Sequence, residues 1–461
     1  MKNSFNIGLL VLMLLSAGNL LKGQTHIISA VGTDSVRYNA YGQKVSRISA
    51  APEYRNGILS FETPDQMFRT WFDLRVNFDG AYYFDKNALN PIGSGVTLRR
   101  LRFAMKTVLY KHWTGEVDLN FANGLDVKDA FLGYRDDDLK FYFKAGYFKE
   151  PICTETTTTS RYQTFIEEPY MTVFAPARQL GIGVSKWDQH YLAAVGVHFQ
   201  DVENSPLVTF TQDINKANGT DEGYSLTGKF VFKPISEPDR VIHLGVSGSY
   251  RTPKTSFEFP NTVRYSSRDM TSVNRKKYLD SDDIAHVKSN ILLGGELYAS
   301  FKNIKFSSEY LQTTVNRETG FSNYKANGMY ASVAYMWFGG KYRYNDEEGE
   351  FTQVSRGRKW GDIETAIRFD YINFNDQTAQ IMGGSANSYT AGITYHINYN
   401  VKFMLNYSFI DHDRYANGKG KLFSGHDSSG NLTSDYSKIT ESAGKGGDDY
   451  GFIQARVEID F

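Results

Sequence analysis

The segment YTAGITYHI at residues 389–397, followed by VKFMLNYSF at residues 401–409, shows the pattern that decides the fold. Apolar or aromatic side chains occupy every second position in both halves, and mostly polar side chains such as Thr394 and Lys402 stand between them. A strand with this period of two has one apolar and one polar face. The short turn makes the two strands antiparallel neighbours. The sequence here predicts a β-hairpin with its apolar face toward lipid and its polar face toward water.

The same alternation recurs along the chain, for example in FDLRVNF at residues 72–78, where the second face is charged. The predicted strands, about sixteen in number, are 70–84, 96–110, 113–122, 126–135, 139–147, 179–188, 190–201, 223–233, 240–251, 290–301, 303–316, 327–337, 361–374, 386–397, 400–412 and 449–461. An even number of alternating strands is typical of bacterial outer-membrane barrels. The sequence therefore predicts an all-β fold, a transmembrane antiparallel β-barrel whose charged faces line a lumen.

The lengths of the connections predict which end of the barrel faces the cell exterior. From the fifth predicted strand onward, long connections such as 148–178 and 413–448 largely alternate with short turns such as 398–399. Long loops in such barrels are extracellular and short turns are periplasmic. The connection 338–360 breaks this pattern, because it should be periplasmic and yet has about two dozen residues.

The start of the chain reads as an export signal. Residues 1–24 place Lys2 before the apolar run Ile7–Leu15 and end on the small residue Gly23, which predicts a secretory signal peptide. Residues 25–69 are neither heptad-patterned nor strongly alternating, so they are expected to form a periplasmic extension or an interior plug.

The other end of the chain indicates the destination. Barrel strands are predicted over residues 70–461, and the last of them ends on the aromatic residue Phe461. Such a terminus looks like the signal that the outer-membrane assembly machinery reads. The predicted location is the outer membrane of a Gram-negative cell, with outer-membrane lipid as a partner.

Composition excludes several classes of function. The 51 Lys and Arg residues balance 51 Asp and Glu residues, so the chain has no basic face for nucleic acid. The single cysteine, Cys153, excludes a disulfide framework and a cysteine-based zinc site. The nine histidines are scattered, and no Ser/His/acid group has the spacing of a hydrolase. No metal, no cofactor and no enzymatic activity are expected.

Four segments resemble a known family of outer-membrane channels. They are LRRLRFAMKTVLYKHWTGEVDLNF (98–121), DVKDAFLGY (126–134), FKAGYFKEP (143–151) and FAPARQLGIGV (174–184). Together they are similar to the phosphate-selective porin O and P family. The resemblance implies a sixteen-stranded barrel that assembles as a homotrimer, with the loop after the fifth strand folded inward to form a constriction.

The resemblance also implies roles for individual residues. In phosphate-binding members, arginines form a ladder down the pore and lysines surround the anion site beside an acidic residue. The matching positions here are Arg75, Arg99, Arg100 and Arg161 for the basic groups and Asp129 for the acidic one. The alternation places Arg99 on the outward face, so Arg99 must lie beyond the bilayer edge or depart from strict alternation. A departure from the family is Glu168, which stands where phosphate-binding members carry an arginine.

The candidate site residues follow from the alternation of inward and outward positions along the strands, together with the family resemblance. Those expected to line the pore and form an anion path are Arg75, Arg100, Arg102, Lys106, Arg161 and Asp129. Those expected in the constriction loop are Glu155, Arg161, Glu167, Glu168 and Arg178. Twelve basic and eleven acidic side chains have inward parity, so the lumen is expected to be close to neutral. These charges either form a local anion path or neutralise one another in salt bridges along the wall.

The sequence bears on three functions. The leading hypothesis is a passive porin for small hydrophilic solutes, with a weak preference for anions such as phosphate. The alternative is a structural or accessory barrel with a closed pore, whose loops 252–289 and 413–448 dock a surface partner. A third, a barrel hydrolase, has no supporting group of residues.

Overall fold

The computed structural model describes a barrel and a small separate N-terminal unit. The described residues are 37–38, 41–45, 50–55, 58–84, 88–199, 223–253, 261–273, 276–442 and 445–461. The predicted signal peptide at residues 1–24 lies outside them. The first unit, residues 1–49, holds the strand pair β1 (Arg37–Tyr38) and β2 (Lys44–Val45). The second unit, residues 50–461, contains the barrel.

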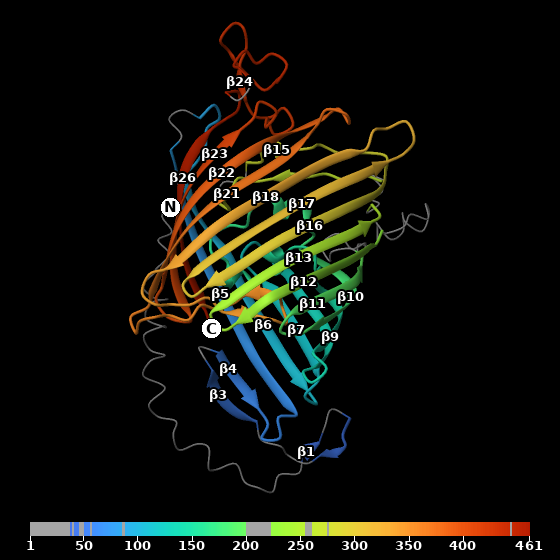
Figure 1. Cartoon of the computed structure of the whole chain (residues 1–461), viewed down its shortest axis with the longest axis vertical. Helices are drawn as coiled ribbons and strands as arrows, with labels where there is room; N and C mark the ends of the chain where they lie inside the picture. Colours follow the sequence, from blue (N-terminus) through green and yellow to red (C-terminus); the bar gives the residue numbers. More distant parts are fainter. Residues whose placement is uncertain are drawn as a thin grey trace, which may run out of the picture. The chain divides into compact units, whose positions relative to one another are not determined.

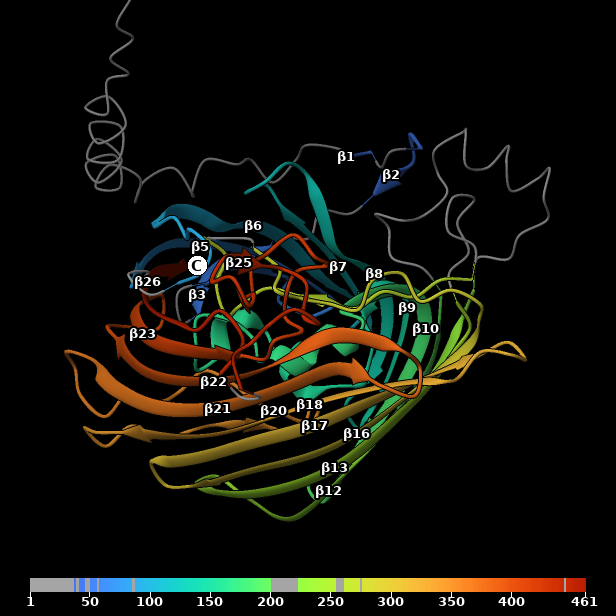
Figure 2. The same cartoon turned by 90° about the horizontal axis from the view of Figure 1, so that it is seen from above.

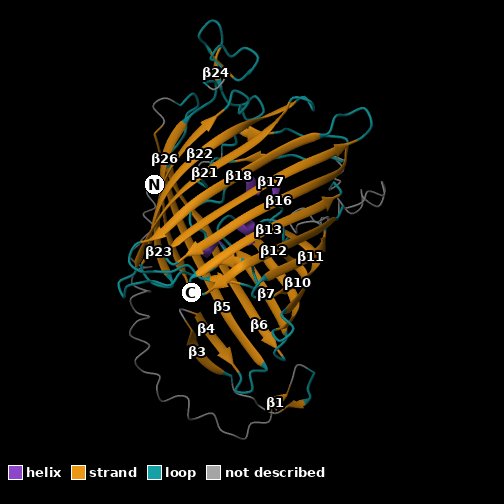
Figure 3. Cartoon of the chain, viewed as in Figure 1, coloured by secondary structure: helices purple, strands orange, loops and turns teal. Residues whose placement is uncertain are grey.

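Sixteen antiparallel strands form a closed barrel, as the alternation predicted (Figures 1 and 3). They are β5 (Phe68–Phe84), β6 (Gly95–Leu109), β7 (Trp113–Asn120), β8 (Asp126–Asp136), β9 (Phe141–Lys149), β10 (Arg178–Trp187), β11 (Tyr191–His198), β12 (Ser225–Glu237), β13 (Arg240–Arg251), β16 (Val287–Phe301), β17 (Ile304–Arg317), β18 (Tyr324–Met336), β21 (Asp362–Asp376), β22 (Ile381–His396), β23 (Val401–His412) and β26 (Tyr450–Asp460). The last strand pairs with the first and closes the cylinder. Closure leaves no unpaired sheet edge in the hydrocarbon region, where unsatisfied backbone groups are costly.

The two faces of each strand have the environments that the sequence pattern predicted. On β23, Phe403 and Leu405 are exposed on the outer surface, whereas Lys402, Met404 and Asn406 are buried inside the barrel. In water an apolar band of this kind would be unfavourable, but lipid covers it in a membrane. The described residues include no helix that is long and apolar enough to cross a membrane.

Arg99 departs from strict alternation because β6 carries a β-bulge. Asn77 of β5 pairs with Arg100, but the next residue, Phe78, pairs with Leu98, so Arg99 is an extra residue in the ladder. A bulge of this type re-aims side chains on the bulged strand. Arg99 therefore points inward beside Arg100, and its guanidinium reaches Glu167 in the lumen.

Residues 150–177, between β9 and β10, fold into the barrel and are called the constriction loop. The loop contains α2 (Thr154–Thr157), η1 (Ser160–Tyr162) and η2 (Tyr170–Phe174), and Figure 2 shows it inside the ring of strands. Its aromatic side chains Tyr170 and Phe174 are buried in the largest apolar cluster of the described chain. The core of the protein thus lies within the barrel, where loops supply the apolar surface.

A second connection contributes to the same cluster from the end of the barrel that the loop lengths predict to be extracellular. Residues 261–273 and 276–286, called the extracellular segment, carry β14 (Ser266–Ser267) and β15 (Leu279–Asp280). Met270 and Tyr278 are buried there, and the Nε2 amide of Gln454 on β26 donates a hydrogen bond to the backbone carbonyl of Met270. The extracellular segment therefore reaches the inner wall. The loop 413–448 carries the short pair β24 (Gly425–His426) and β25 (Leu432–Thr433).

The long connection that broke the length pattern, and that was predicted to be periplasmic, also folds inward. Residues 337–361, called the periplasmic segment, contain β19 (Tyr344–Asn345) and β20 (Glu350–Phe351). Tyr342 and Phe351 pack in one buried cluster with Phe165 of the constriction loop. Burial of these aromatic rings explains the extra length, because a short turn could not reach the constriction loop.

A short hairpin continues the barrel sheet before β5. β3 (Ala51–Arg55) pairs with β4 (Ile58–Glu62), and Ser60–Glu62 of β4 pairs with Arg69–Trp71 of β5. The C-terminal strand pairs with β5 only from Arg75 onward, so this hairpin lies along the part of β5 that extends beyond β26.

Candidate pore and its constriction

The constriction loop is held in place by charged contacts with the barrel wall. Arg75 on β5 donates from Nε to Asp460 at 3.0 Å and from Nη1 to Ser160 of the loop at 2.7 Å. Arg161 of the loop pairs with Asp73, and Lys402 donates to the backbone carbonyl of Arg161 at 2.7 Å. Buried charge-assisted bonds of this kind are the stronger hydrogen bonds in proteins. Arg75 and Arg161 therefore fix the loop rather than stand free in the pathway.

The first turn of the constriction loop is anchored on the opposite wall. Glu309 of β17 accepts the backbone N–H groups of Thr154 at 3.1 Å and Glu155 at 2.7 Å. The carboxylate of Glu155 accepts from the hydroxyl of Tyr330 on β18 at 3.2 Å. Glu155 thus contacts the wall formed by β17 and β18. Its role is attachment of the loop.

A cluster of arginines surrounds Glu167 at the middle of the barrel. Arg99 donates to Glu167 at 2.9 and 3.3 Å, and Arg456 donates to Asp79 at 2.7 Å from both Nε and Nη2. Burial by itself would raise the pKa of Glu167, but Arg99 and Arg456 outweigh that effect and lower its pKa to about 2. Glu167 is consequently a fixed negative charge among the arginines.

Arg100 stands in this cluster without a comparable partner. Its side chain is 5% exposed, and among the described residues its Nε and Nη1 atoms have no hydrogen-bond acceptor. The electrostatic neighbours that affect it most are Arg99 and Arg456, which are also cations. A buried guanidinium without acceptors is costly, and an anion would supply the missing acceptors.

The remaining predicted wall charges neutralise one another. Lys106 lies 3.2 Å from Glu116 and 3.8 Å from Asp73, and Arg102 lies 3.8 Å from Asp118. For Lys106 and Arg102, the structure thus favours the salt-bridge alternative. Such pairs keep an aqueous wall polar while they contribute little net field.

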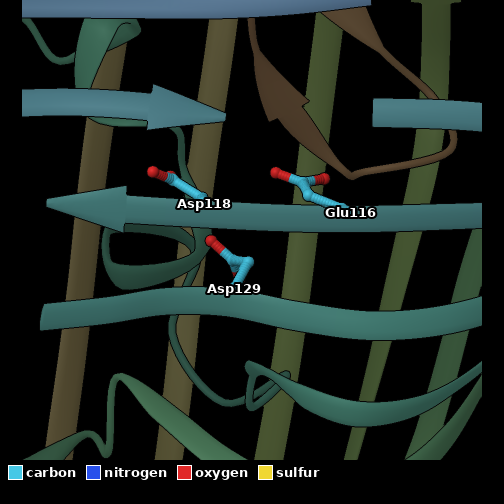
Figure 4. Close-up of side chains that lie close together, drawn as sticks. All are labelled: Glu116, Asp118 and Asp129. Atoms are coloured by element: carbon cyan, nitrogen blue, oxygen red, sulfur yellow. The ribbon is translucent and has the colours of Figure 1, made fainter. Parts of the chain in front are cut away.

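Three carboxylates of this wall form one group. Figure 4 shows Glu116 and Asp118 on one strand and Asp129 on its neighbour, and their nearest oxygen atoms lie within 4.8 Å of one another. Arg178 donates to Asp129 at 2.8 Å, so Asp129 is neutralised, as Glu116 is by Lys106. Arg178 is the first residue of β10 rather than part of the loop.

A cavity of about 350 Å³ lies between these wall charges and the two inward-folded segments. Of the predicted residues, it is lined by Arg75, Arg102, Lys106, Asp129 and Arg178. Thr157, Thr159 and Ser160 of the constriction loop line it from one side. This cavity lies beside the constriction loop and is the candidate solute chamber.

Other predicted residues lie outside this cavity. Arg161 lines a smaller cavity of about 50 Å³ nearer the short turns, together with Glu364 and His396. Glu168 accepts a hydrogen bond from Gln163 of the same loop at 3.0 Å. The arginine cluster with Arg100 and Glu167 likewise does not line the larger cavity.

The acidic lining that the periplasmic segment supplies was not predicted from the sequence. Glu347, Glu348 and Glu350 all line the cavity, and Glu347 forms an ion pair of 3.0 Å with Arg135. The run DEEGE at residues 346–350, in a connection too long for a periplasmic turn, was the available signal. Lys144 and Lys149 of β9 also line the cavity.

Comparisons with known proteins agree with this architecture. The family model for "Phosphate-selective porin O and P" matches residues 72–432. Porin O of Pseudomonas aeruginosa is 21% identical over 377 residues, which cover 74% of this chain and 82% of that protein. The solved structure of the outer-membrane expressed OmpT of Vibrio cholerae is similar in fold, with a TM-score of 0.51 at 9% identity, over 86% of this chain and 98% of that one. The chain with this arginine-lined, loop-constricted barrel is an outer-membrane channel protein and belongs to the phosphate-selective porin O and P family.

Proposed function

We propose that this protein is a passive outer-membrane channel for small hydrophilic solutes with a weak preference for anions, and that Arg100 is its principal anion contact. The observation that carries the proposal is the buried Arg100 guanidinium, whose Nε and Nη1 atoms find no acceptor in the described part of the chain. It stands beside Arg99 and Arg456, so an anion there meets a local excess of positive charge. We also expect the channel to assemble as a homotrimer in the membrane.

The preference is expected to be weak because carboxylates already occupy much of the cluster. Glu167 pairs with Arg99, and Asp79 pairs with Arg456. A phosphate ion would have to approach Arg100 against these two fixed negative charges. Glu168 adds a third carboxylate next to Glu167 in the chain. We therefore expect chloride and phosphate to pass without a tight phosphate site.

The test is single-channel recording of the refolded protein in planar bilayers. Arg100→Gln should reduce the chloride-to-potassium permeability ratio about twofold to fivefold, since one charge near the ion path is worth up to about 1 kcal/mol in water-like dielectric. Arg240→Gln is the matched control, because Arg240 is exposed and pairs with Glu237 at the end of β12. An unchanged ratio in Arg100→Gln would contradict the proposed role of Arg100.

The alternative of a closed accessory barrel is favoured by a different observation. The extracellular segment and the constriction loop share one buried apolar cluster inside the barrel, with Tyr265 and Phe174 in edge contact at 5.3 Å between ring centroids. Such packing narrows the extracellular half. A protein of this kind would show no conductance in bilayers and would purify with a stoichiometric surface partner.

A further inference from the structure

The chamber beside the constriction is lined by equal numbers of basic and acidic side chains. Seven basic and seven acidic side chains line the cavity of about 350 Å³. A balanced set of charges gives little attraction to a solute with one net charge. A solute that carries both charges can contact groups of both signs.

Lys144 is a cation in this cavity that has no carboxylate partner within ion-pair distance among the described residues. Its ammonium lies over the ring of Tyr142 at 4.5 Å and over the ring of Phe131 at 5.3 Å from the centroids. Both rings also line the cavity. Aromatic faces stabilise the ammonium without neutralising it. Glu348 attracts Lys144 from beyond ion-pair distance, so the Lys144 ammonium can still make a direct contact with a carboxylate of a solute.

Two acidic side chains in the same cavity have carboxylate oxygens that can accept further hydrogen bonds. Glu348 of the periplasmic segment is exposed and lines the cavity, and no ion pair of its carboxylate is formed with a described residue. Asp118 is only 9% exposed, and within the described chain its Oδ1 atom has no hydrogen-bond partner. Asp118 and Glu348 are therefore available to an ammonium group of a solute.

We infer that the cavity is a subsite for zwitterionic solutes of the size of an amino acid or dipeptide, with Lys144 as the carboxylate contact and Glu348 and Asp118 as ammonium contacts. The inference rests on the proposed channel function and adds a substrate class to it. Phe131 and Tyr142 would contact the carbon skeleton of the solute. The hydroxyl groups of Thr157 and Ser160, on the constriction-loop side, add polar contacts that carry no charge.

The test is liposome swelling with the full-length mature protein in isosmotic solutions of glycylglycine or of arabinose, a neutral solute of similar size. The wild-type protein should pass glycylglycine faster than arabinose. Lys144→Gln and Glu348→Gln should each lower the ratio of the two rates, by up to about fivefold for contacts with partly exposed charges. Lys288→Gln and Glu237→Gln are matched controls on exposed positions of β16 and β12.

Arabinose and two singly charged derivatives of glycylglycine separate the possible outcomes. N-acetyl-glycylglycine lacks the ammonium and glycylglycine amide lacks the carboxylate, so both should lose the advantage over arabinose in the wild-type protein. A protein that passes no arabinose would contradict the channel function itself. A protein that passes arabinose and glycylglycine at the same rate, unchanged in both variants, would overturn the zwitterion subsite alone.

Discussion

Arg99 of β6 and Glu167 of the constriction loop form a two-point ion pair, with Nε–Oε1 and Nη2–Oε2 distances of 2.9 and 3.3 Å. The pair exists because the bulge at Arg99 turns a side chain inward that strict alternation would have placed in lipid. It joins the inward-folded loop to the wall at the arginine cluster. The same pair removes much of the positive charge that an anion would otherwise meet.

Glu167→Gln should make the channel more selective for anions. The carboxylate is ionised at all pH values above about 3. Burial alone would raise its pKa, but the neighbouring arginines outweigh this effect and hold the pKa at about 2. Removal of this carboxylate takes the ion-pair partner from Arg99, which stands beside Arg100. The chloride-to-potassium permeability ratio from reversal potentials should rise about twofold to fivefold. An unchanged or lower ratio would show that the cluster does not face the ion path.

Selectivity should also depend on pH, through two carboxyl groups of the periplasmic segment. Burial and the neighbouring Glu348 raise the pKa of Glu347 to about 7 and that of Glu350 to about 8, against the opposing effects of Arg135 and Lys149. Both groups are neutral below about pH 6 and ionised above about pH 9. Raising the pH across this window adds two negative charges to the cavity lining.

We therefore expect the preference for anions to fall as the pH rises from 6 to 9. The measurement is the reversal potential in a potassium chloride gradient at several pH values. The double variant Glu347→Gln with Glu350→Gln should show a clearly shallower profile in the same range. A flat profile in the wild-type protein would rule out titration of these groups in the pathway.

Release of the periplasmic segment should widen the channel. Lys233 is fully buried, and its Nζ donates to Asp346 at 2.6 Å and to the backbone carbonyl of Asp188 at 2.8 Å. Lys233→Met removes both bonds and leaves the carboxylate of Asp346 without its ion-pair partner, with the Ser236 hydroxyl still donating to it. Single-channel conductance and cleavage by added protease within residues 337–361 should both increase. Lys341→Met, on an exposed residue of the same segment, should change neither.

Asp269 should be important for the stability of the extracellular half. Its buried carboxylate accepts from the hydroxyl groups of Tyr170 at 2.7 Å and Tyr450 at 2.5 Å, and His412 lies at 3.2 Å. Asp269→Ala leaves three buried polar groups without their partner and should lower the free energy of unfolding by about 3 kcal/mol. Thermal unfolding in detergent measures this loss.

The variant Asp269→Asn separates the contribution of the charge of Asp269 from that of its hydrogen bonds. Burial opposes ionisation of Asp269, yet His412 and the two tyrosines hold its pKa below the usual value of an aspartate. The charge therefore contributes stability above about pH 4, which is lost as the pH falls through the lowered pKa. Asp269→Asn should retain part of the stability at pH 7. Equal stability of Asp269→Ala and the wild-type protein would contradict the role assigned to Asp269.

The barrel could be predicted from the sequence because membrane strands obey a local rule. Lipid on one side and water or polar loops on the other impose a period of two, so segments such as 401–409 show the face of each residue directly. All sixteen strands were expected within a few residues of their bounds. The inward folding of 150–177 was expected from the family resemblance.

The partners inside the lumen could not be predicted in the same way. The inward orientation of Arg99 could be predicted only by someone who knew of the bulge in β6. That bulge depends on the register between β5 and β6 rather than on the local sequence pattern. The ion pairs Lys233–Asp346 and Arg135–Glu347 join residues about a hundred or more positions apart, through a segment whose inward path no periodicity marks. Alternation identifies which side chains face inward, but only the packed loops decide which of them remain unpaired.

The reversal potential of the wild-type channel at pH 6 in a tenfold potassium chloride gradient tests the proposed anion preference. We expect a reversal potential displaced modestly toward the equilibrium potential of chloride, and we expect Arg100→Gln to reduce this displacement toward zero. A silent protein in the bilayer, or a potential displaced toward the equilibrium potential of potassium and unaffected by Arg100→Gln, would contradict a weakly anion-preferring channel.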